Sequence, residues 1–447
     1  MKKSSVMINV VRSVMILCLA GSAPVFADED VMKKMEAMEK RIAELESRLA
    51  EYESRDKRTE SKIKKVEMKM AGVEGKVSGV EERLQKVPPE LEGLTDGLGI
   101  AAGATMVYQF TDNANGSGLS SSSEDAGDAA YSVDLEITKE FADYGAGLIL
   151  LEAGEGAGVE DELEVFSNVN FDATGGDSNV GVVEAWYEHY IGNAALRFGK
   201  LDPTYLIDDN DYANDESAQF LGRIFRNNPV AAFPDNGAGI RLGVAATDMI
   251  DIESLVMDGD ADWEDMFEDV FYAGQINITP GLFDRPGNYR FYAWGSEADH
   301  VLWADAARTK EDNYGFGISF DQEMSDDLGV FARYGWQDPD VYASGASESL
   351  EQSYSVGAQL AGSAWGRGDD VVGLAFGVVV PSEEYKNSNS ALEAGDEKHL
   401  ELYYSYKVND HLTISPDLQV VWDPYGGDAA NGDKTILVGG VRSQIDF

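Results

Sequence analysis

The sequence predicts an all-β transmembrane barrel of about 16 antiparallel strands, preceded by an N-terminal α-helical coiled coil. Three observations support this fold class: an export signal, a long heptad pattern, and sixteen alternating segments of which the last ends on phenylalanine. In that last segment, residues 434–447, Leu437, Val441 and Phe447 share one face and Arg442 lies on the other. A strand that is apolar outside and polar inside, with an aromatic residue at its end, is typical of outer-membrane barrels.

Residues 1–27 have the features of a secretory signal peptide. Basic residues precede a short apolar core at 14–19, and Ala27 is the last residue before the expected cleavage site. The apolar core is too short for a spanning helix. The single cysteine, Cys18, lies within this segment, so we expect a mature chain without disulfides, thiolate metal sites or a cysteine nucleophile. The expected location is the bacterial outer membrane.

Residues 28–89 are predicted to form a coiled coil with a Pro-Pro linker at its end. Between residues 31 and 87, apolar residues recur with a period of 3.5 over eight heptads. At 1.5 Å per residue, such a helix would be a rod of roughly 85 Å. Asp56 and Thr59 interrupt the apolar seam at its middle, and Pro88 and Pro89 stop the helix. We expect the coil to lie in the periplasm, with peptidoglycan or another part of the cell wall as a candidate partner.

Residues 90–447 are predicted to form the outer-membrane barrel domain. The connections alternate between long and short, as they do in barrels with long extracellular loops and short periplasmic turns. Sixteen strands leave an aqueous lumen, whereas the side chains of an eight-stranded barrel fill it. The expected strands are about 98–110, 128–141, 145–154, 181–191, 194–201, 237–246, 250–257, 270–279, 287–297, 313–322, 328–337, 352–362, 371–380, 398–408, 412–422 and 434–447.

The charge of the chain is divided unevenly. Residues 28–89 carry 15 acidic and 15 basic residues, whereas residues 90–447 carry 66 acidic and 17 basic residues. A domain of this charge repels nucleic acid and anionic surfaces, so we predict no nucleic-acid partner. It attracts cations.

Strand alternation assigns a set of charged side chains to the inner face of the barrel. An arginine on the lipid face at mid-membrane would cost ~2–4 kcal/mol, so these charges must face water or each other. Two interpretations remain open: a constriction that orients a polar solute between opposing charges, or ordinary solvated pore walls and salt bridges. The inward candidates are Arg197, Arg241, Arg290, Arg333, Arg442, Asp134, Glu136, Glu184, Glu188, Glu401 and Asp417.

The long connection 202–236 is the strongest candidate for a constriction loop. A loop of this length within a compact domain is usually functional or disordered, and its aromatic residues favour folding into the lumen. It carries Asp208, Asp209 and Asp211, followed by a short helical pattern at 220–226. Residues 258–264 are superficially similar to a calcium loop but lack the glycine that position six requires. We predict neither a metal site nor a cofactor.

Several motifs in the barrel domain resemble the OprB family of carbohydrate-selective porins. They are the segments Phe198-Gly-Lys-Leu-Asp202, Val330-Phe-Ala-Arg-Tyr-Gly-Trp336, Glu401-Leu-Tyr-Tyr404 and Ser415-Pro-Asp-Leu-Gln419. The resemblance implies a sixteen-stranded outer-membrane channel for passive uptake of small polar solutes, often sugars. A coiled coil ahead of such a barrel is also similar to the LbtU-type siderophore porins, which implies ferric siderophores as alternative solutes.

The leading functional hypothesis is therefore a passive porin, with a siderophore or iron-uptake porin as the first alternative. The second alternative is an envelope tether that links the outer membrane to the cell wall through the coil. An enzyme is not expected, because the four histidines lack metal-ligand spacing and no nucleophile elbow or phosphate loop is present. The expected partners are outer-membrane lipid, a small polar solute and two further copies of the chain in a homotrimer.

Overall fold

The structure is a computed structural model, and it describes residues 96–116, 124–171, 179–264 and 268–447. The predicted signal peptide at 1–27 and the predicted coiled coil at 28–89 lie outside these residues. The chain separates into two units, Met1–Gln85 and Lys86–Phe447, and the second contains all of the described residues.

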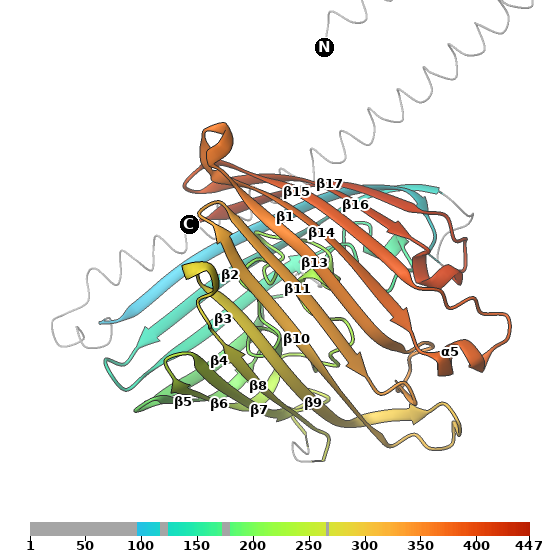
Figure 1. Cartoon of the computed structure of the whole chain (residues 1–447), viewed down its shortest axis with the longest axis horizontal. Helices are drawn as coiled ribbons and strands as arrows, with labels where there is room; N and C mark the ends of the chain where they lie inside the picture. The colour runs from blue at the N-terminus through green and yellow to red at the C-terminus, as the bar shows by residue number, and fades with distance from the viewer. Residues whose placement is uncertain (1–95, 117–123, 172–178, 265–267) are drawn as a thin grey trace, which may run out of the picture. The chain divides into compact units, whose positions relative to one another are not determined.

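The second unit is a closed antiparallel β-barrel (Figure 1). Each barrel strand pairs with the next along the chain, and the last pairs with the first in a continuous register from Gly103 opposite Asp446 to Asp112 opposite Leu437. The barrel strands are β1 (Leu98–Ala114), β2 (Glu124–Glu140), β3 (Gly145–Glu155), β4 (Gly181–Ile191), β5 (Ala194–Leu201), β6 (Gly237–Thr247), β7 (Ile250–Asp258), β8 (Val270–Ile278), β9 (Gly287–Leu302), β10 (Glu311–Ser325), β11 (Leu328–Gln337), β13 (Leu350–Gly362), β14 (Arg367–Pro381), β15 (Glu397–Asn409), β16 (Leu412–Trp422) and β17 (Ile436–Asp446).

These sixteen strands confirm the predicted all-β barrel. The described chain has one further strand, β12 (Val341–Ala343), which pairs with the far end of β9 and lies within the connection between β11 and β13. We expected no strand there, because the predicted loop 338–351 has no sustained alternation. β9 itself extends to Leu302, five residues beyond its expected end, and its last three residues pair with β12.

In the part of the chain that the structure describes, the helices are short and lie in connections. They are η2 (Glu160–Glu162), η3 (Pro203–Tyr205), α4 (Arg223–Arg226), η4 (Leu282–Asp284), η5 (Ser363–Trp365), α5 (Glu383–Ser388) and η6 (Pro424–Gly427). Among the described residues, no helix has both the length and the apolar character that a membrane crossing requires.

Alternation decides which side chains face out and which face in. On β16, Pro416 and Leu418 are exposed on the outer wall, whereas Ser415, Asp417 and Gln419 are buried inside. The same two-residue period runs through β17, where Arg442 is buried and its neighbour Val441 is 42% exposed. A barrel in lipid needs this arrangement, because its outer face meets hydrocarbon and its inner face meets polar groups.

The inner core forms where two connections fold back against the wall. We call residues 202–236 loop L3 and residues 156–171 segment L2. Ile207 and Ala231 of L3 pack on β7, β8 and β9, Phe220 and Phe225 of L3 pack on β11, β14 and β15, and Val169 of L2 packs on β16 and β17. The lumen is therefore partly filled by the chain itself.

Glycines on the inner wall allow this close approach. A Cβ added to Gly377 on β14 would lie 2.5 Å from the Cδ1 atom of Ile224 in L3. A Cβ added to Gly335 on β11 would lie 2.4 Å from the side-chain nitrogen of Asn228. Any larger residue at these two positions would require the side chain of Ile224 or Asn228 to move.

The alternation predicts a depth-dependent effect of charge on the outer wall. Leu418, near the middle of β16 and 41% exposed, is expected to destabilise the barrel by ~2–4 kcal/mol when replaced by arginine. Leu412→Arg, on the same face but at the first residue of the strand, is the control and should cost ~0–1 kcal/mol near the interface. Urea unfolding in lipid vesicles measures both, and equal costs would contradict the assignment of the outer face.

Candidate functional site

Loop L3 starts directly at the end of β5. Asp202 caps η3 by accepting hydrogen bonds from the Thr204 N–H and hydroxyl, at 2.8 and 2.6 Å. Pro203 at the first helical position suits this turn, because its fixed φ is already helical and its missing N–H would have no partner there. This turn directs the following residues into the lumen.

The first charged anchor of L3 is Arg290 on β9. Its Nε lies 2.6 Å from the Asp209 carboxylate of the loop, and its Nη1 donates to Asp321 on β10. Asp211 stands farther off, at 3.7 Å from Arg290 Nη2. Arg290 is only 3% exposed, so this cluster of one arginine and three aspartates joins the loop to two neighbouring strands.

The second anchor is Arg333 on β11, which is fully enclosed with Asp208. Arg333 Nε is 3.4 Å from the Asp208 carboxylate, and its Nη atoms donate to the backbone oxygens of Phe225 and Asp208 at 2.6 and 3.0 Å. Burial raises the pKa of the Asp208 carboxyl to about 6, although the Arg333 guanidinium acts in the opposite direction. A charged pair without water depends on these extra hydrogen bonds to remain favourable.

The third anchor comes from β15 and β17. Leu221 and Gly222 donate their backbone N–H groups to the two carboxylate oxygens of Glu401, at 2.6 and 2.9 Å. Arg442 donates from Nη1 to the backbone oxygens of Glu216 and Gln219, at 2.7 and 2.8 Å. Wall side chains therefore pair with backbone groups that would otherwise be buried without partners.

Segment L2 is held in the same way, and the sequence did not predict this. Glu397 on β15 accepts from the backbone N–H groups of Phe166 and Ser167, and His399 on the same strand bonds the Ser167 hydroxyl at 2.9 Å. Gln109 on β1 donates to the backbone oxygen of Val169 at 2.9 Å. The polar alternation at 397, 399 and 401 is the sequence feature that could have indicated a wall covered by loops.

The structure separates the predicted lumen residues into three groups. Glu136 and Glu184, with Asp134, face an open cavity beside L3. Arg197, Arg241 and Glu188 form a separate cluster on β4, β5 and β6, in which both arginines lie 3.0 Å from one Glu188 oxygen. The third group gathers around L3. Asp208, Asp209 and Asp211 belong to the loop, and Arg290, Arg333, Arg442 and Glu401 are wall residues that bond to it. Asp417 is a buried wall residue of β16 that accepts a hydrogen bond from Gln419.

Burial in this third group differs from the expected constriction of opposing charges. Arg333, Arg442 and Glu401 are at most 3% exposed, so they hold the loop and do not face a passing solute. Strand alternation identifies an inward side chain, but it does not show whether water or another segment of the chain covers it.

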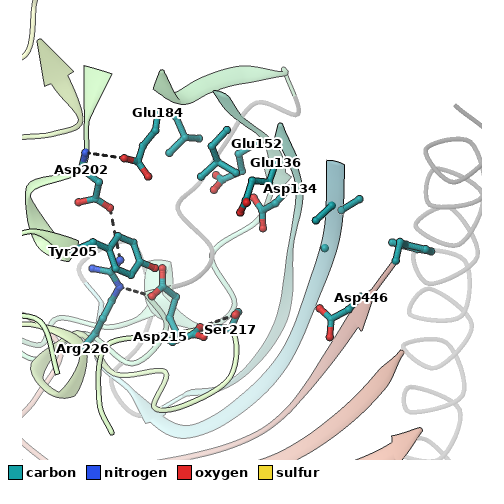
Figure 2. A pocket seen from close by; sticks show the side chains of 17 residues that line it. Asp134, Glu136, Glu152, Glu184, Asp202, Tyr205, Asp215, Ser217, Arg226 and Asp446 are labelled. Atoms are coloured by element: carbon teal, nitrogen blue, oxygen red, sulfur yellow. Dashed lines mark hydrogen bonds and ion pairs between the residues drawn. The ribbon is translucent and has the colours of Figure 1, made fainter. Parts of the chain in front are cut away.

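The open cavity lies between L3 and the inner faces of β1 to β4, with a volume of about 380 Å³ (Figure 2). On the wall side, Asp134 and Glu136 come from β2, Glu152 from β3 and Glu184 from β4. Figure 2 shows these carboxylates opposite Asp202, Tyr205, Asp215 and Arg226 of L3, and Glu216 of the same loop also belongs to the lining.

Carboxylates dominate this cavity. Eight of its lining residues are acidic, with Asp446 from β17 as the eighth, and Arg226 is the only basic one among them. The Arg226 guanidinium is already engaged, since it bonds Glu216 and lies between the rings of Tyr205 and Phe171 at 4.8 and 4.9 Å. Burial raises the pKa of the Glu216 carboxyl, and the same arginine opposes that rise. The cavity therefore presents a negative surface.

The acidic connection after β7 brings three carboxylates together. Oxygens of Asp258, Asp260 and Asp262 lie within 4.8 Å of one another, and the latter two are exposed. The Trp263 N–H donates to Asp258 at 3.1 Å. Acidic loops of this kind are common without an ion, and the geometry alone assigns no metal here.

Comparison with known proteins places the barrel in a family. The profile described as "Carbohydrate-selective porin, OprB family" matches residues 93–447, which include every strand of the barrel. This chain belongs to the OprB family. The predicted family resemblance is thereby confirmed, and the LbtU-type subgroup is not.

The solved structures of porins share this fold. The high-pH structure of Pseudomonas putida OprB has a TM-score of 0.63 and 17% sequence identity. The match covers 80% of this chain and 96% of the OprB chain. The outer-membrane channel DcaP of Acinetobacter baumannii has a TM-score of 0.51 and 11% sequence identity. The match covers 79% of this chain and 98% of the DcaP chain.

A curated protein of Aquifex aeolicus (strain VF5), described as uncharacterized, is 25% identical over 242 residues. The match covers 54% of this chain, and the chain spans 64% of the length of that relative.

Family membership supports a general role as a porin. OprB-family proteins are passive channels of the outer membrane and are not enzymes, as predicted. The siderophore and tether alternatives find no support in these comparisons. The homotrimer, and a contact between the coil at 28–89 and peptidoglycan, remain predictions from the sequence.

The buried pair Arg333–Asp208 gives a quantitative prediction about L3. Arg333→Met should lower the free energy of unfolding by about 3–5 kcal/mol, because it leaves a buried aspartate without its cation. Adding Asp208→Asn should recover most of this loss. Arg308→Met, which breaks an exposed ion pair with Glu311, is the control and should cost less than about 1 kcal/mol. Urea unfolding in detergent measures all three, and equal losses for the two single arginine variants would show that L3 is not anchored by this pair.

Proposed function

We propose that this protein is a passive diffusion channel for small polar solutes of the carbohydrate type, with a preference for cations over anions. The observation that carries the proposal is the cavity beside L3, which is open, polar and lined by eight carboxylates. Membership of the carbohydrate-selective porin family supports the sugar as solute class.

The physical basis is a lumen that the central part of L3 narrows from the side of β8 to β17. L3 is anchored to β8 to β11, β15 and β17, so the space left for solute lies along the inner faces of β1 to β4. Rings of carboxylates favour cations in channels, because they replace part of the hydration of the ion and repel anions. A neutral sugar can pass such a surface, since its hydroxyl groups donate hydrogen bonds to carboxylate oxygens.

Planar-bilayer recording of the purified full-length protein tests this function. Stable conductance steps and a concentration-dependent block by maltodextrins are expected, because a sugar that occupies the cavity excludes ions from it. Ferric siderophores are the comparison solute. Block by siderophores without block by sugars would transfer the assignment to iron uptake, and a folded barrel without conductance would contradict a channel.

The cation preference has its own prediction. Neutralising three wall carboxylates together, as Asp134→Asn, Glu136→Gln and Glu152→Gln, should shift the reversal potential in a KCl gradient towards zero. These side chains face the cavity, so the change removes charge without touching the anchors of L3. The matched control makes the same charge change at three turn residues, of which the first and last are exposed and the second is half-buried, as Asp248→Asn, Asp327→Asn and Asp410→Asn.

The control variant should keep most of the wild-type reversal potential, because none of the three turn residues lines the cavity. Equal shifts in the two triple variants would mean that the overall charge of the barrel, and not the cavity, sets the ion preference.

A further inference from the structure

A second cavity lies inside the barrel at its short-turn end, between the ends of β4, β5, β6 and β7. Its volume is about 380 Å³, and it is formed by different residues from the cavity beside L3. The turn 192–193 between β4 and β5 belongs to its lining, and turns this short mark the periplasmic end of outer-membrane barrels. The four strands are neighbours in the barrel (Figure 1).

Strand register gives this cavity a small floor between two larger side chains. Tyr190 on β4 is opposite Ala195 on β5, Ala195 is opposite Gly243 on β6, and Gly243 is opposite Glu253 on β7. Side chains that are opposite each other in this way lie on the same face of the sheet. The row therefore has an aromatic ring at one end, a carboxylate at the other and almost no side chain between them.

Gly243 has a specific reason to be glycine. A Cβ at this position would lie 2.4 Å from Nη2 of Arg241, which is on the same strand and the same face. The guanidinium of Arg241 therefore lies directly over the bare backbone of Gly243. A planar group held flat against the floor leaves the space above it open.

Arg241 is held in place and still has hydrogen-bonding capacity. Its Nε and Nη2 donate to the two carboxylate oxygens of Glu253, and its Nη1 donates to Glu188 at 3.0 Å. A guanidinium has five N–H donors, and these bonds use three of them. Asp251, which also lines the cavity, adds a second carboxylate beside Glu253.

We propose that this cavity is a solute-binding subsite for a sugar ring at the periplasmic exit of the channel, with Tyr190 as the stacking surface and the Arg241–Glu253 pair and Asp251 as hydrogen-bonding partners. The inference rests on the proposed function, because it names a second station for the same class of solute. The Tyr190 side is apolar enough to cover one face of a pyranose, and the residue is 42% exposed.

Ligand chemistry supports a cyclic polyol as the occupant. Pockets for small molecules have volumes of about 300–1,000 Å³ and combine an apolar wall with a few well-placed polar groups. A sugar presents C–H groups on its ring faces and hydroxyl groups on its edge. Vicinal hydroxyls can accept from a guanidinium and donate to a carboxylate at once, which the fixed Arg241–Glu253 pair offers.

Sided addition of sugar in planar bilayers tests the subsite. D-Glucose and maltotriose are added on the short-turn side, and the dissociation constant for block is measured for the wild type and two variants. Tyr190→Ala should raise this constant about fivefold through loss of the stacking surface. Ala195→Leu, which fills the floor, should raise it by at least as much. Tyr144→Ala is the control, because Tyr144 is an exposed tyrosine of a neighbouring short turn that does not line the cavity.

The outcomes distinguish the two proposals. If sugar blocks the wild type and the dissociation constants of both subsite variants lie within twofold of the wild-type value, the subsite is overturned and the channel function stays intact. Equal weakening by Tyr144→Ala would also overturn it, since the effect would then belong to the whole rim. If sugar blocks the wild-type channel from neither side, both proposals are overturned. Stable conductance steps in salt alone show that each variant has folded and inserted.

Discussion

The closing register between β1 and β17 is the constraint on which the rest of the structure depends. Lipid offers no hydrogen bonds, so each backbone N–H and C=O within the membrane must pair inside the protein, and an open sheet edge is not tolerated. Ten residue pairs, from Gly103–Asp446 to Asp112–Leu437, remove the two edges that β1 and β17 would otherwise expose. Closure also fixes the inner circumference, and every inward side chain must then be accommodated within it.

A closed barrel of sixteen strands encloses more space than its own side chains fill, and the chain uses part of that space for L3 and L2. Where the irregular backbone of L3 and L2 is buried against the wall, away from water, it must find hydrogen-bond partners in the protein, as backbone in lipid must. The wall satisfies this requirement with charged groups: the carboxylate of Glu401 and the guanidinium of Arg442 bond backbone atoms of L3, and Glu397 bonds those of L2. Desolvated charges are costly, and several hydrogen bonds to each of them offset that cost.

The sequence predicts the barrel well because its main signal is local. The expected bounds of β4, β5, β11 and β16 coincide with the structure, since alternation and short turns mark both ends of these strands. Where a strand is longer than the ~9–11 residues that cross a bilayer, as β9 is, the apolar alternation stops while backbone pairing continues, and the predicted end is too early.

The candidate site was less predictable, because it depends on contacts between distant segments. Alternation places Arg333 and Glu136 on the inner face equally well, but the first is covered by L3 and the second faces the cavity. The inward path of L2 depends on Glu397 and His399, more than 200 residues away, and no local pattern encodes that contact. β12 forms only because β9 offers it an edge.

The one-sided attachment of L3 has a consequence for how such a channel can change. Among the described residues, the central part of the loop bonds to strands between β8 and β17, whereas the proposed solute path follows β1 to β4. Most of the side chains that anchor the centre of L3 and most of the carboxylates that line the cavity therefore lie in different arcs of the same wall. Substitutions along β2 and β3 can therefore change the lining of the cavity without breaking the hydrogen bonds that hold the centre of L3, although all of these strands belong to one continuous sheet.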